Sequence, residues 1–314
     1  MSRNLLILGS SGFVGRSILR HISENSKIYK KKISSLTLVS RRNNSVEIIE
    51  KLKKSFKIYL LKKNFFNIGK LPKSEFIIYA LLQKNYKQEI KSINHFIKIL
   101  NKEISCNIIF TSSGAVYGDK IYKRNKLKES SKINTNYNFS SPQKVEYARS
   151  KIAIEQILKN FSNNSNKISI LRCFAFVGVD LPRNKKFVIG NFIDNIFKLK
   201  KIFVKSEYKI FRSYMHQDEM SRWILKILFN IKNSYSIYNV GSDDAISIHN
   251  LALKLSQKYR LPFQSNFSKE TNLIENYIPN TKLAQKKFNL KLNYNTLQAI
   301  NKTIIEIKKT DYKI

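Results

Sequence analysis

Near its N-terminus the chain reads Leu5-Leu-Ile-Leu-Gly9-Ser-Ser-Gly12-Phe-Val-Gly15, and this stretch decides the fold. Its four apolar residues predict a short buried strand, and the apolar spacing that follows predicts a helix from Phe13. Glycine permits the tight turn between them and lets a ligand approach the backbone. Such a turn presents a helix N-terminus to a pyrophosphate, so the stretch predicts a dinucleotide-binding site. The residues expected to contact the dinucleotide are Gly9, Ser11, Gly12, Phe13, Val14 and Gly15.

Length and composition describe a globular chain. With 314 residues and 42% apolar content, it can bury one large core or two smaller ones. No apolar run reaches the roughly 18 residues of a membrane helix. Because the glycine turn starts at residue 9, we expect no signal peptide and no membrane insertion, and therefore a cytoplasmic protein. Cys106 and Cys173 lie in predicted strands, which favours neither a disulfide framework nor a metal site.

The net charge of +37 is the most unusual feature of the composition. It comes from 46 Lys and only 12 Arg, spread through every segment rather than gathered in one stripe. Abundant Lys, Asn, Ile, Phe and Tyr are typical of AT-rich codons, so we interpret the charge as compositional drift. No specific nucleic-acid partner is expected, although a functional basic surface would give salt-sensitive binding to polyanions.

Strand and helix patterns alternate through the first half of the chain. The expected strands are 4–9, 35–40, 56–61, 75–81, 105–112 and 167–174, and the expected helices are 13–24, 44–54, 86–102 and 145–160. Short links between them imply parallel strands with helices on both faces. The fold class is therefore α/β, a Rossmann-type doubly wound parallel sheet, with ligands beyond the carboxyl ends of its strands.

The second half follows a less regular rhythm. Residues 119–142 carry many Lys, Ser and Asn and few large aliphatic residues, which predicts a long surface loop. Beyond it we expect helices at 187–199, 218–230, 247–258 and 295–309 and strands at 208–215 and 235–240. We interpret residues 1–174, with return segments near 208–242, as the dinucleotide-binding domain. Residues 175–314 form mainly a smaller C-terminal substrate-binding lobe.

A Tyr and a Lys four residues apart mark the candidate catalytic helix. Tyr147 and Lys151 share one face of the predicted helix 145–160. A nearby ammonium favours the phenolate, and such a Tyr can exchange a proton with a hydroxyl or carbonyl while hydride moves at the same carbon. The pairs Tyr59/Lys63 and Tyr122/Lys126 have the same spacing but lie in a predicted strand and a predicted loop, so the context selects Tyr147/Lys151.

Strand 105–112 leads into Ser112-Ser-Gly-Ala-Val-Tyr-Gly118 and so delivers hydroxyl groups to the carboxyl edge of the sheet. Serine at a strand end is often a turn former. Together with the glycine turn and the Tyr/Lys pair, however, Ser113 is favoured as the group that hydrogen-bonds the reacting oxygen.

These pieces resemble the extended short-chain dehydrogenase/reductases, in particular the nucleotide-sugar epimerase/dehydratase group. The resemblance spans residues 9 to about 242 in the order of the family. It rests on Gly9–Gly15, Ser112–Gly118, Tyr147–Lys151, Leu171–Gly178, Arg212–Asp218 and Tyr238–Ser242, with a weaker continuation at Tyr277-Ile-Pro-Asn280. Each motif alone is weak evidence for the family, whereas the whole set in this order is specific to it.

The resemblance implies roles for single residues. Ser113, Tyr147 and Lys151 would form the catalytic set, and Ala80 and Lys151 would also contact the cofactor. Arg212 would bind the phosphates of a nucleotide sugar, a surface ion pair being the alternative. Asn191 would lie near the nucleotide of the substrate. Asp218 is interpreted as the N-cap of helix 218–230 rather than as a catalyst.

Departures from the family pattern narrow the activity. The 4,6-dehydratases carry an Asp-Glu pair where this chain has Gly114 and Ala115, neither of which transfers a proton. Asn64 replaces an expected aspartate and can still hydrogen-bond adenine. Ala175 replaces the usual Asn after the sixth strand, which weakens the expectation of a specific substrate contact there.

Two adjacent arginines bear on the cofactor. An acidic residue at the end of the second strand would bind the ribose 2′-hydroxyl of NAD. The chain has Ser40-Arg41-Arg42 there, which suits a 2′-phosphate, so NADP is the preferred cofactor and NAD a possible one.

The sequence thus predicts an NAD(P)-dependent oxidoreductase or epimerase acting at C4 of a nucleotide-activated sugar, in the synthesis of a surface polysaccharide. The alternatives are a nucleotide-sugar 4,6-dehydratase of the dTDP-glucose type and a non-catalytic dinucleotide- or RNA-binding relative. The resemblance also implies a homodimer formed through helices 86–102 and 145–160.

Overall fold

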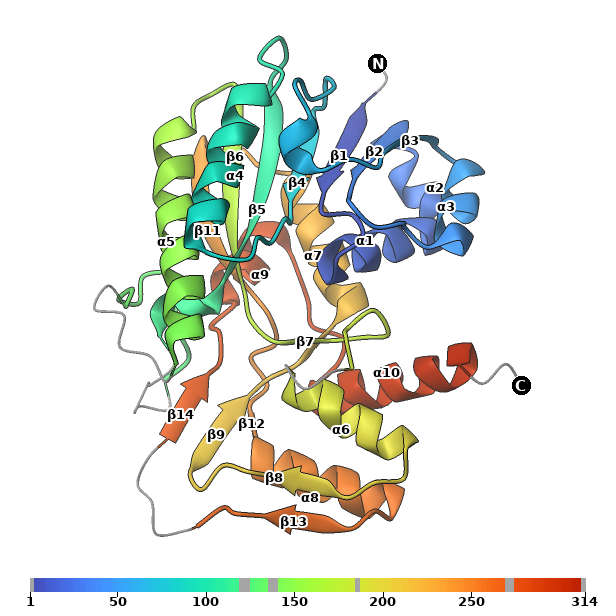
Figure 1. Ribbon diagram of the computed structural model, residues 1–314, viewed down its shortest axis with the longest axis vertical. Helices are drawn as coiled ribbons and strands as arrows, with labels where there is room; N and C mark the ends of the chain where they lie inside the picture. Colours follow the sequence, from blue (N-terminus) through green and yellow to red (C-terminus); the bar gives the residue numbers. More distant parts are fainter. Residues whose placement is uncertain (1–2, 119–124, 135–140, 184–186, 269–273, 312–314) are drawn as a thin grey trace. The chain divides into compact units, whose positions relative to one another are not determined.

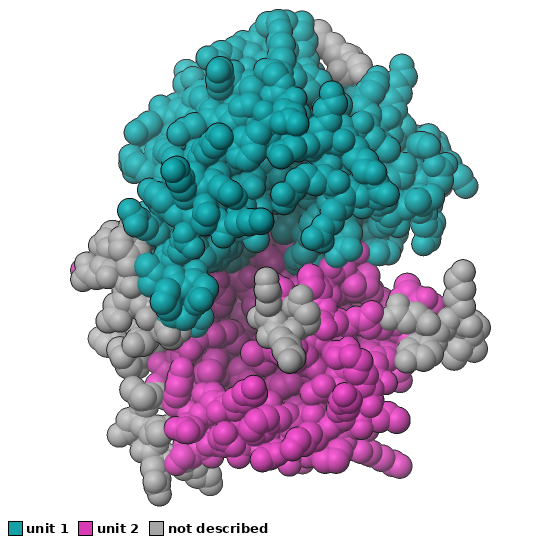
Figure 2. Space-filling view, viewed as in Figure 1, with its two compact units in different colours: residues 1–116, 141–173, 221–238 teal, residues 117–140, 174–220, 239–314 magenta. Residues whose placement is uncertain are grey.

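The computed structural model describes residues 3–118, 125–134, 141–183, 187–268 and 274–311. The chain forms two compact units, each assembled from several segments (Figure 2). Unit 1 comprises residues 1–116, 141–173 and 221–238, and unit 2 comprises residues 117–140, 174–220 and 239–314. Within the described residues, no helix has both the length and the apolar character needed to cross a bilayer.

The central sheet has seven strands in the order β11-β6-β5-β4-β1-β2-β3 (Figure 1). The strands are β1 (Asn4–Leu8), β2 (Ser35–Val39), β3 (Lys57–Leu61), β4 (Phe76–Tyr79), β5 (Cys106–Ser113), β6 (Asn166–Cys173) and β11 (Tyr235–Val240). Neighbours from β3 to β6 pair in parallel, and the order reverses direction between β1 and β4. This arrangement confirms the predicted doubly wound Rossmann-type sheet, whose ligand site lies at that reversal.

Both faces of the sheet are covered, which explains why its strands are almost continuously apolar. The helices of unit 1 are α1 (Phe13–Glu24), α2 (Ser26–Tyr29), α3 (Val46–Lys53), α4 (Tyr86–Ile99) and α5 (Pro142–Phe161). Leu6 and Leu8 of β1 share a buried core with apolar residues of α4 and α5. Leu5 and Ile7 point to the opposite face, because side chains alternate along a strand.

Two short 3₁₀ turns follow strands of the sheet, η1 (Phe65–Asn67) after β3 and η2 (Gly114–Tyr117) directly after β5. Helix α7 (Gln217–Leu228) runs from unit 2 into unit 1. There its Leu228 carbonyl accepts a hydrogen bond of 3.1 Å from Asn107 Nδ2 of β5. Since Asn107 and Ile108 point to opposite faces, α7 packs on the face of the sheet that α4 and α5 leave uncovered.

Unit 2 is built from short strands and longer helices. Its strands are β7 (Phe176–Val177), β8 (Ile202–Val204), β9 (Lys209–Arg212), β10 (Met215–His216), β12 (Ile246–Ser247), β13 (Phe263–Ser265) and β14 (Ile274–Tyr277). Its helices are α6 (Val188–Phe197), α8 (Ile248–Tyr259), α9 (Lys282–Phe288) and α10 (Thr296–Asp311). Strand β9 pairs in parallel with β14 and antiparallel with β12, which makes it the centre of a three-stranded sheet.

The structure confirms the six predicted strands of the first half to within two residues at each end, and corrects three details. The predicted strand 208–215 is two strands, β9 and β10, with different partners. Helix α5 starts at Pro142, three residues earlier than predicted. Proline is compatible with a first helical turn, because the backbone N–H groups there have no partner within the helix and proline lacks such a group. Asp218 lies inside the first turn of α7, which begins at Gln217, so it is not the N-cap.

The predicted loop 119–142 is described only in part. Leu127 forms an isolated parallel bridge with Pro279 within unit 2, and Ser141 and Pro142 already belong to the start of α5. Residues 119–124 and 135–140 of the predicted loop lie outside the described residues.

Candidate active site

The turn after β1 is as tight as its glycines imply. Gly9 has φ +90°, and a Cβ there would lie 2.5 Å from the carbonyl oxygen of Ala80 at the end of β4. Gly12 is the N-cap of α1, and its N–H donates to Gly9 O at 3.0 Å. A Cβ at Gly15 would lie 2.5 Å from the same Gly9 oxygen. Two of these positions therefore exclude any side chain, because backbone atoms already occupy the space.

A cavity of about 510 Å³ lies at this turn, in unit 1. Its lining includes seven residues that the sequence predicts at the dinucleotide: Gly9, Ser11, Gly12, Arg41, Arg42, Asn64 and Ala80. Phe13 and Val14 are half-buried in the first turn of α1, and Gly15 packs against the glycine turn itself. The cavity thus opens at the carboxyl ends of β1, β2 and β4, where a doubly wound sheet binds its ligands.

The cavity is strongly cationic. Its lining carries five basic residues, Arg41, Arg42, Lys63, Lys84 and Lys91, and no Asp or Glu is among the described residues that form it. The loop that bears the arginines is held by Ser40, whose hydroxyl donates to Arg42 O at 2.6 Å. Sequence reasoning missed the three lysines. Lys63 could have been found because it is the second residue after β3, at the same edge of the sheet as Arg41.

The two proposed catalytic residues, Tyr147 and Lys151, lie on the same face of α5, one at an exposed position and the other at a buried one. Ser141 caps the helix by accepting a hydrogen bond from Lys144 N, which sets the start of its first turn. Lys151 Nζ lies 5.6 Å from the ring centroid of Tyr147 and 4.9 Å from that of Phe110 in β5. Tyr147 is 37% exposed and Lys151 only 2%. The phenol can therefore reach a ligand while the ammonium is buried behind it.

The two serines at the end of β5 have different surroundings. Ser112 donates to Glu155 Oε1 at 2.5 Å, and that carboxylate is also bound by Arg172 at 2.7 Å inside the core. Ser113 is the last residue of β5, and its Oγ accepts a hydrogen bond of 3.1 Å from Ala115 N in η2. Ser112 therefore belongs to a buried structural network, and Ser113 is the hydroxyl at the sheet edge.

One residue beside Lys151 was not predicted. Glu89 of α4 is 2% exposed, and its Oε1 lies 3.9 Å from Lys151 Nζ. The carboxylate also accepts a hydrogen bond from the backbone N–H of Gln83, which lines the cationic cavity. The signal in the sequence is the spacing of Glu89 to Ile93 and Phe96, which puts the carboxylate on the inward face of the helix.

The predicted substrate-binding residues belong to unit 2. Arg212 of β9 forms an ion pair with Glu275 of β14, and its guanidinium lies 5.4 Å from the ring centroid of Tyr277. Its side chain is 21% exposed, and its guanidinium also donates to the carbonyl oxygen of Phe211 at 2.9 Å. Asn191 is half-buried in α6.

Asn239 of the motif Tyr238-Asn-Val-Gly-Ser242 forms hydrogen bonds to several segments of unit 2. Asn239 Nδ2 donates to Leu127 O at 2.8 Å and to Asn280 O at 3.3 Å, and its Oδ1 accepts from Tyr117 Oη at 2.9 Å. The backbone N–H of Asn239 donates to Glu129 Oε1. One amide side chain thus joins three segments that are distant in the sequence.

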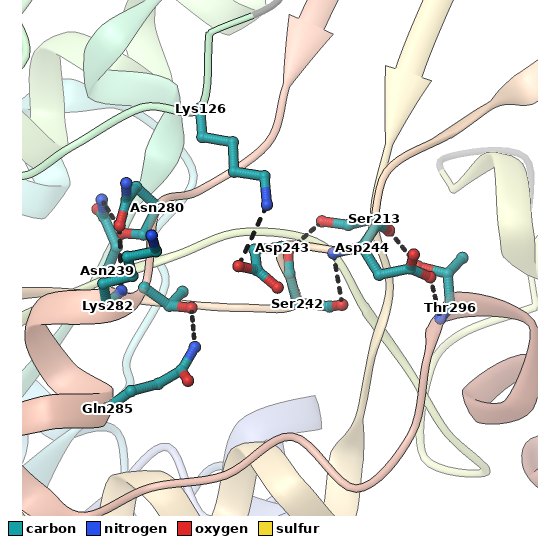
Figure 3. Close-up of polar contacts among 11 residues, drawn as sticks. Lys126, Ser213, Asn239, Ser242, Asp243, Asp244, Asn280, Lys282, Gln285 and Thr296 are labelled. Atoms are coloured by element: carbon teal, nitrogen blue, oxygen red, sulfur yellow. Dashed lines mark hydrogen bonds and ion pairs between the residues drawn. The ribbon is translucent and has the colours of Figure 1, made fainter.

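Polar contacts continue along the same stretch, as Figure 3 shows. Ser213 donates to the carbonyl oxygen of Ser242, and Thr296 donates through its backbone and its hydroxyl to Asp244. Lys126 Nζ lies 3.2 Å from Asp243. We therefore interpret the motif as structural, because each polar group named above binds another part of the protein.

Comparison with known proteins gives the family. The model of the NAD dependent epimerase/dehydratase family matches residues 5–241, about three quarters of the chain. The chain belongs to this family. Among curated proteins, none matches it by sequence.

Solved structures of such epimerases and dehydratases have the same fold along the whole chain. The dTDP-glucose 4,6-dehydratase of Bacillus anthracis, in complex with NAD, has a TM-score of 0.77 at 14% identity, over 99% of this chain and 98% of that one. The UDP-glucose 4-epimerase of Thermotoga maritima, with UDP-glucose, has a TM-score of 0.72 at 17% identity, over 98% and 99%. An NAD-dependent NDP-hexosamine 5,6-dehydratase of tunicamycin biosynthesis has a TM-score of 0.74 at 15% identity and full coverage of both chains.

The residues of this family member fit a nicotinamide dinucleotide. Gly9, Ser11 and Gly12 of the glycine turn line the cavity, and Gly12 is the N-cap of α1, so a pyrophosphate there would lie at a helix N-terminus. Basic groups line the cavity, and no carboxylate that would repel phosphate is found among the described residues of its lining. By contrast, no group of three or more His, Cys, Asp and Glu that could hold a metal ion occurs within the described residues.

Proposed function

We propose that the protein is an NADP-preferring oxidoreductase or epimerase that acts at C4 of a nucleotide-activated sugar. The observation that carries this proposal is the pairing on α5 of an accessible phenol, Tyr147, with a buried ammonium, Lys151. The link of Lys151 through Glu89 to Gln83 relates this pair to the cationic cavity. The family and its structural neighbours support a nicotinamide cofactor and a nucleotide-sugar substrate.

The chemistry asked of these residues is proton transfer at a sugar oxygen. A bound nicotinamide dinucleotide supplies the hydride acceptor or donor for the same carbon. Tyr147 takes the proton from the C4 hydroxyl when the carbon is oxidised and returns it when the carbon is reduced. Lys151 stabilises the phenolate, and the Ser113 hydroxyl orients the reacting oxygen by a hydrogen bond.

The residues after Ser113 favour oxidation–reduction over dehydration. Elimination of water needs a group that protonates the leaving hydroxyl and a base that removes the neighbouring proton. Gly114 and Ala115 form the start of η2 and offer neither group. A 4-ketoreductase or a 4-epimerase is therefore our conclusion.

The cavity supports the cofactor preference. Arg41 and Arg42 both line it, and the part of the lining that the structure describes holds no carboxylate that would compete with a phosphate. The 2′-phosphate of NADP is the cofactor group that such arginines bind best.

The test is turnover of UDP- and dTDP-activated hexoses and their 4-keto forms, followed at 340 nm and by mass spectrometry. Net consumption of NADPH identifies a ketoreductase, inversion without net reduction an epimerase, and a product lighter by one water a dehydratase. Tyr147→Phe should lower turnover by about 10²-fold or more while NADPH binding stays within about twofold. Tyr59→Phe, from the other Tyr/Lys pair of unit 1, is the matched control. Full activity in Tyr147→Phe would refute the proposal.

A further inference from the structure

A buried carboxylate faces the proposed catalytic lysine. Glu89 and Lys151 are each 2% exposed and come from two different helices, α4 and α5. Their charged atoms lie 3.9 Å apart. A surface pair such as Glu50 and Lys53 of α3, by contrast, has both side chains more than half exposed and is screened by water.

The hydrogen bonds of Glu89 are too few to stabilise a buried charged carboxylate. Oε1 accepts one bond of 3.3 Å from Gln83 N, and Oε2 is buried with no hydrogen-bond partner among the described residues. A carboxylate removed from water is stable only when it is paired. The ammonium of Lys151 likewise requires a partner of opposite charge, because it is equally buried and lies over the rings of Phe110 and Tyr147.

Other titratable groups also lie on the elements around the pair. Burial raises the pKa of the Cys173 thiol of β6 to about 12, and the charge of Lys151 offsets that rise only in part. Burial also raises the pKa of Tyr79 of β4, and Glu89 adds to the rise. Tyr147 of α5 is the proton-transfer group itself. The nearby pair of Glu155 and Arg172 is internally neutral. The charge that faces Lys151 from these elements is therefore that of Glu89.

We propose that Glu89 is a positioning residue of the active site, whose buried carboxylate pairs with the ammonium of Lys151 and holds it beside Tyr147. The proposal rests on the function proposed above for Lys151. Because Gln83 donates to the same carboxylate, Glu89 also connects the loop that lines the cofactor cavity to the catalytic helix. Its effect on the reaction is exerted through Lys151, and it contacts no substrate.

A double-mutant cycle tests the pairing without any substrate. The unfolding equilibrium of the full chain is measured in urea for the wild type, Glu89→Gln, Lys151→Met and the double variant. We expect Glu89→Gln to raise the unfolding constant about tenfold or more in the wild-type background and much less in the Lys151→Met background. An equal effect in both backgrounds would overturn the pairing. If Glu89→Gln is insoluble, recovery of soluble protein in the double variant supports the pairing, and its failure refutes it.

The ammonium of Lys151 gives a second readout. Its ¹⁵N signal, assigned by its loss in Lys151→Met, is recorded for each variant under the same conditions. We expect the signal to move in Glu89→Gln, because the ammonium loses the carboxylate that faces it. Glu89→Asp should keep a signal close to that of the wild type, and the surface control Glu50→Gln should change nothing. An unmoved signal in Glu89→Gln overturns this inference alone. An active Tyr147→Phe beside a moved signal would instead overturn the proposed function.

Discussion

Replacing both cavity arginines should convert the cofactor preference. Arg41 and Arg42 follow β2, line the cationic cavity and have exposed side chains. In the double variant Arg41→Ala/Arg42→Ala the glycine turn is untouched, since the two residues lie on a separate loop. The binding of the pyrophosphate, which NADP and NAD share, should therefore change little.

The magnitude follows from two exposed charge-assisted hydrogen bonds. A bond between charged groups contributes about 1.5–3 kcal/mol, and the lower end applies here because water screens exposed arginines. Two such bonds give about 3 kcal/mol. At about 1.4 kcal/mol for each factor of ten, the double variant should bind NADPH about 100-fold more weakly. Its affinity for NADH should stay within about threefold.

The assay is titration of the purified protein with NADPH and NADH, followed by nucleotide fluorescence at low and high salt. The wild-type preference for NADPH should shrink as salt rises, because salt screens the exchange of charge with the 2′-phosphate. Lys62→Ala is the matched control: it removes an exposed cation next to Lys63 that does not line the cavity. Equal losses for NADPH and NADH in the double variant would refute the assignment of these arginines to the 2′-phosphate.

Three further outcomes test the structure. Glu155→Gln leaves the buried guanidinium of Arg172 uncompensated and should lower the free energy of unfolding by about 3 kcal/mol, measured in urea, whereas the exposed control Glu50→Gln should cost less than about 0.5 kcal/mol. Asn239→Leu removes three side-chain hydrogen bonds and should cost about 3 kcal/mol; a loss below about 1 kcal/mol would contradict the network drawn for unit 2. Burial raises the pKa of the Cys106 thiol to about 12, so only about one molecule in 10⁴ is a thiolate at pH 8. Iodoacetamide should therefore label Cys106 far more slowly in the folded protein than in urea, and equal rates would show that the thiol is not buried.

Local patterns were sufficient to predict the strands of the sheet and the helix that carries Tyr147 and Lys151. Buried parallel strands are short apolar runs, so the bounds predicted for β2, 35–40, differ from Ser35–Val39 by one residue. The glycine turn was readable because Gly9 is required by the backbone at its own position. The Tyr147/Lys151 pair was readable because residues four apart share a helix face.

The short strands of unit 2 were not readable. Strands of two to four residues, such as β12 and β14, are too brief to show an alternating pattern. β14 exists because Ile274 pairs with Lys209, which lies 65 residues earlier in the chain. The strand predicted at 208–215 is divided into β9 and β10 for a similar reason, because β9 pairs with β14 and β10 pairs with β7.

The sequence alone predicted a doubly wound sheet, a glycine turn for a dinucleotide, and a Tyr/Lys pair on one helix. The turn and the pair depend on residues within one or two turns of each other, where covalent spacing already sets the geometry. The sheet joins strands that are distant in the chain, but the alternation of short apolar strands with helices was enough to predict it. The tertiary structure, in contrast, was needed to show that Lys63, Lys84 and Lys91 join the arginines around one cavity and that Glu89 pairs with Lys151. These contacts link separate elements, and a glutamate in a helix is ordinarily a surface residue until the packing of α4 on α5 removes it from water.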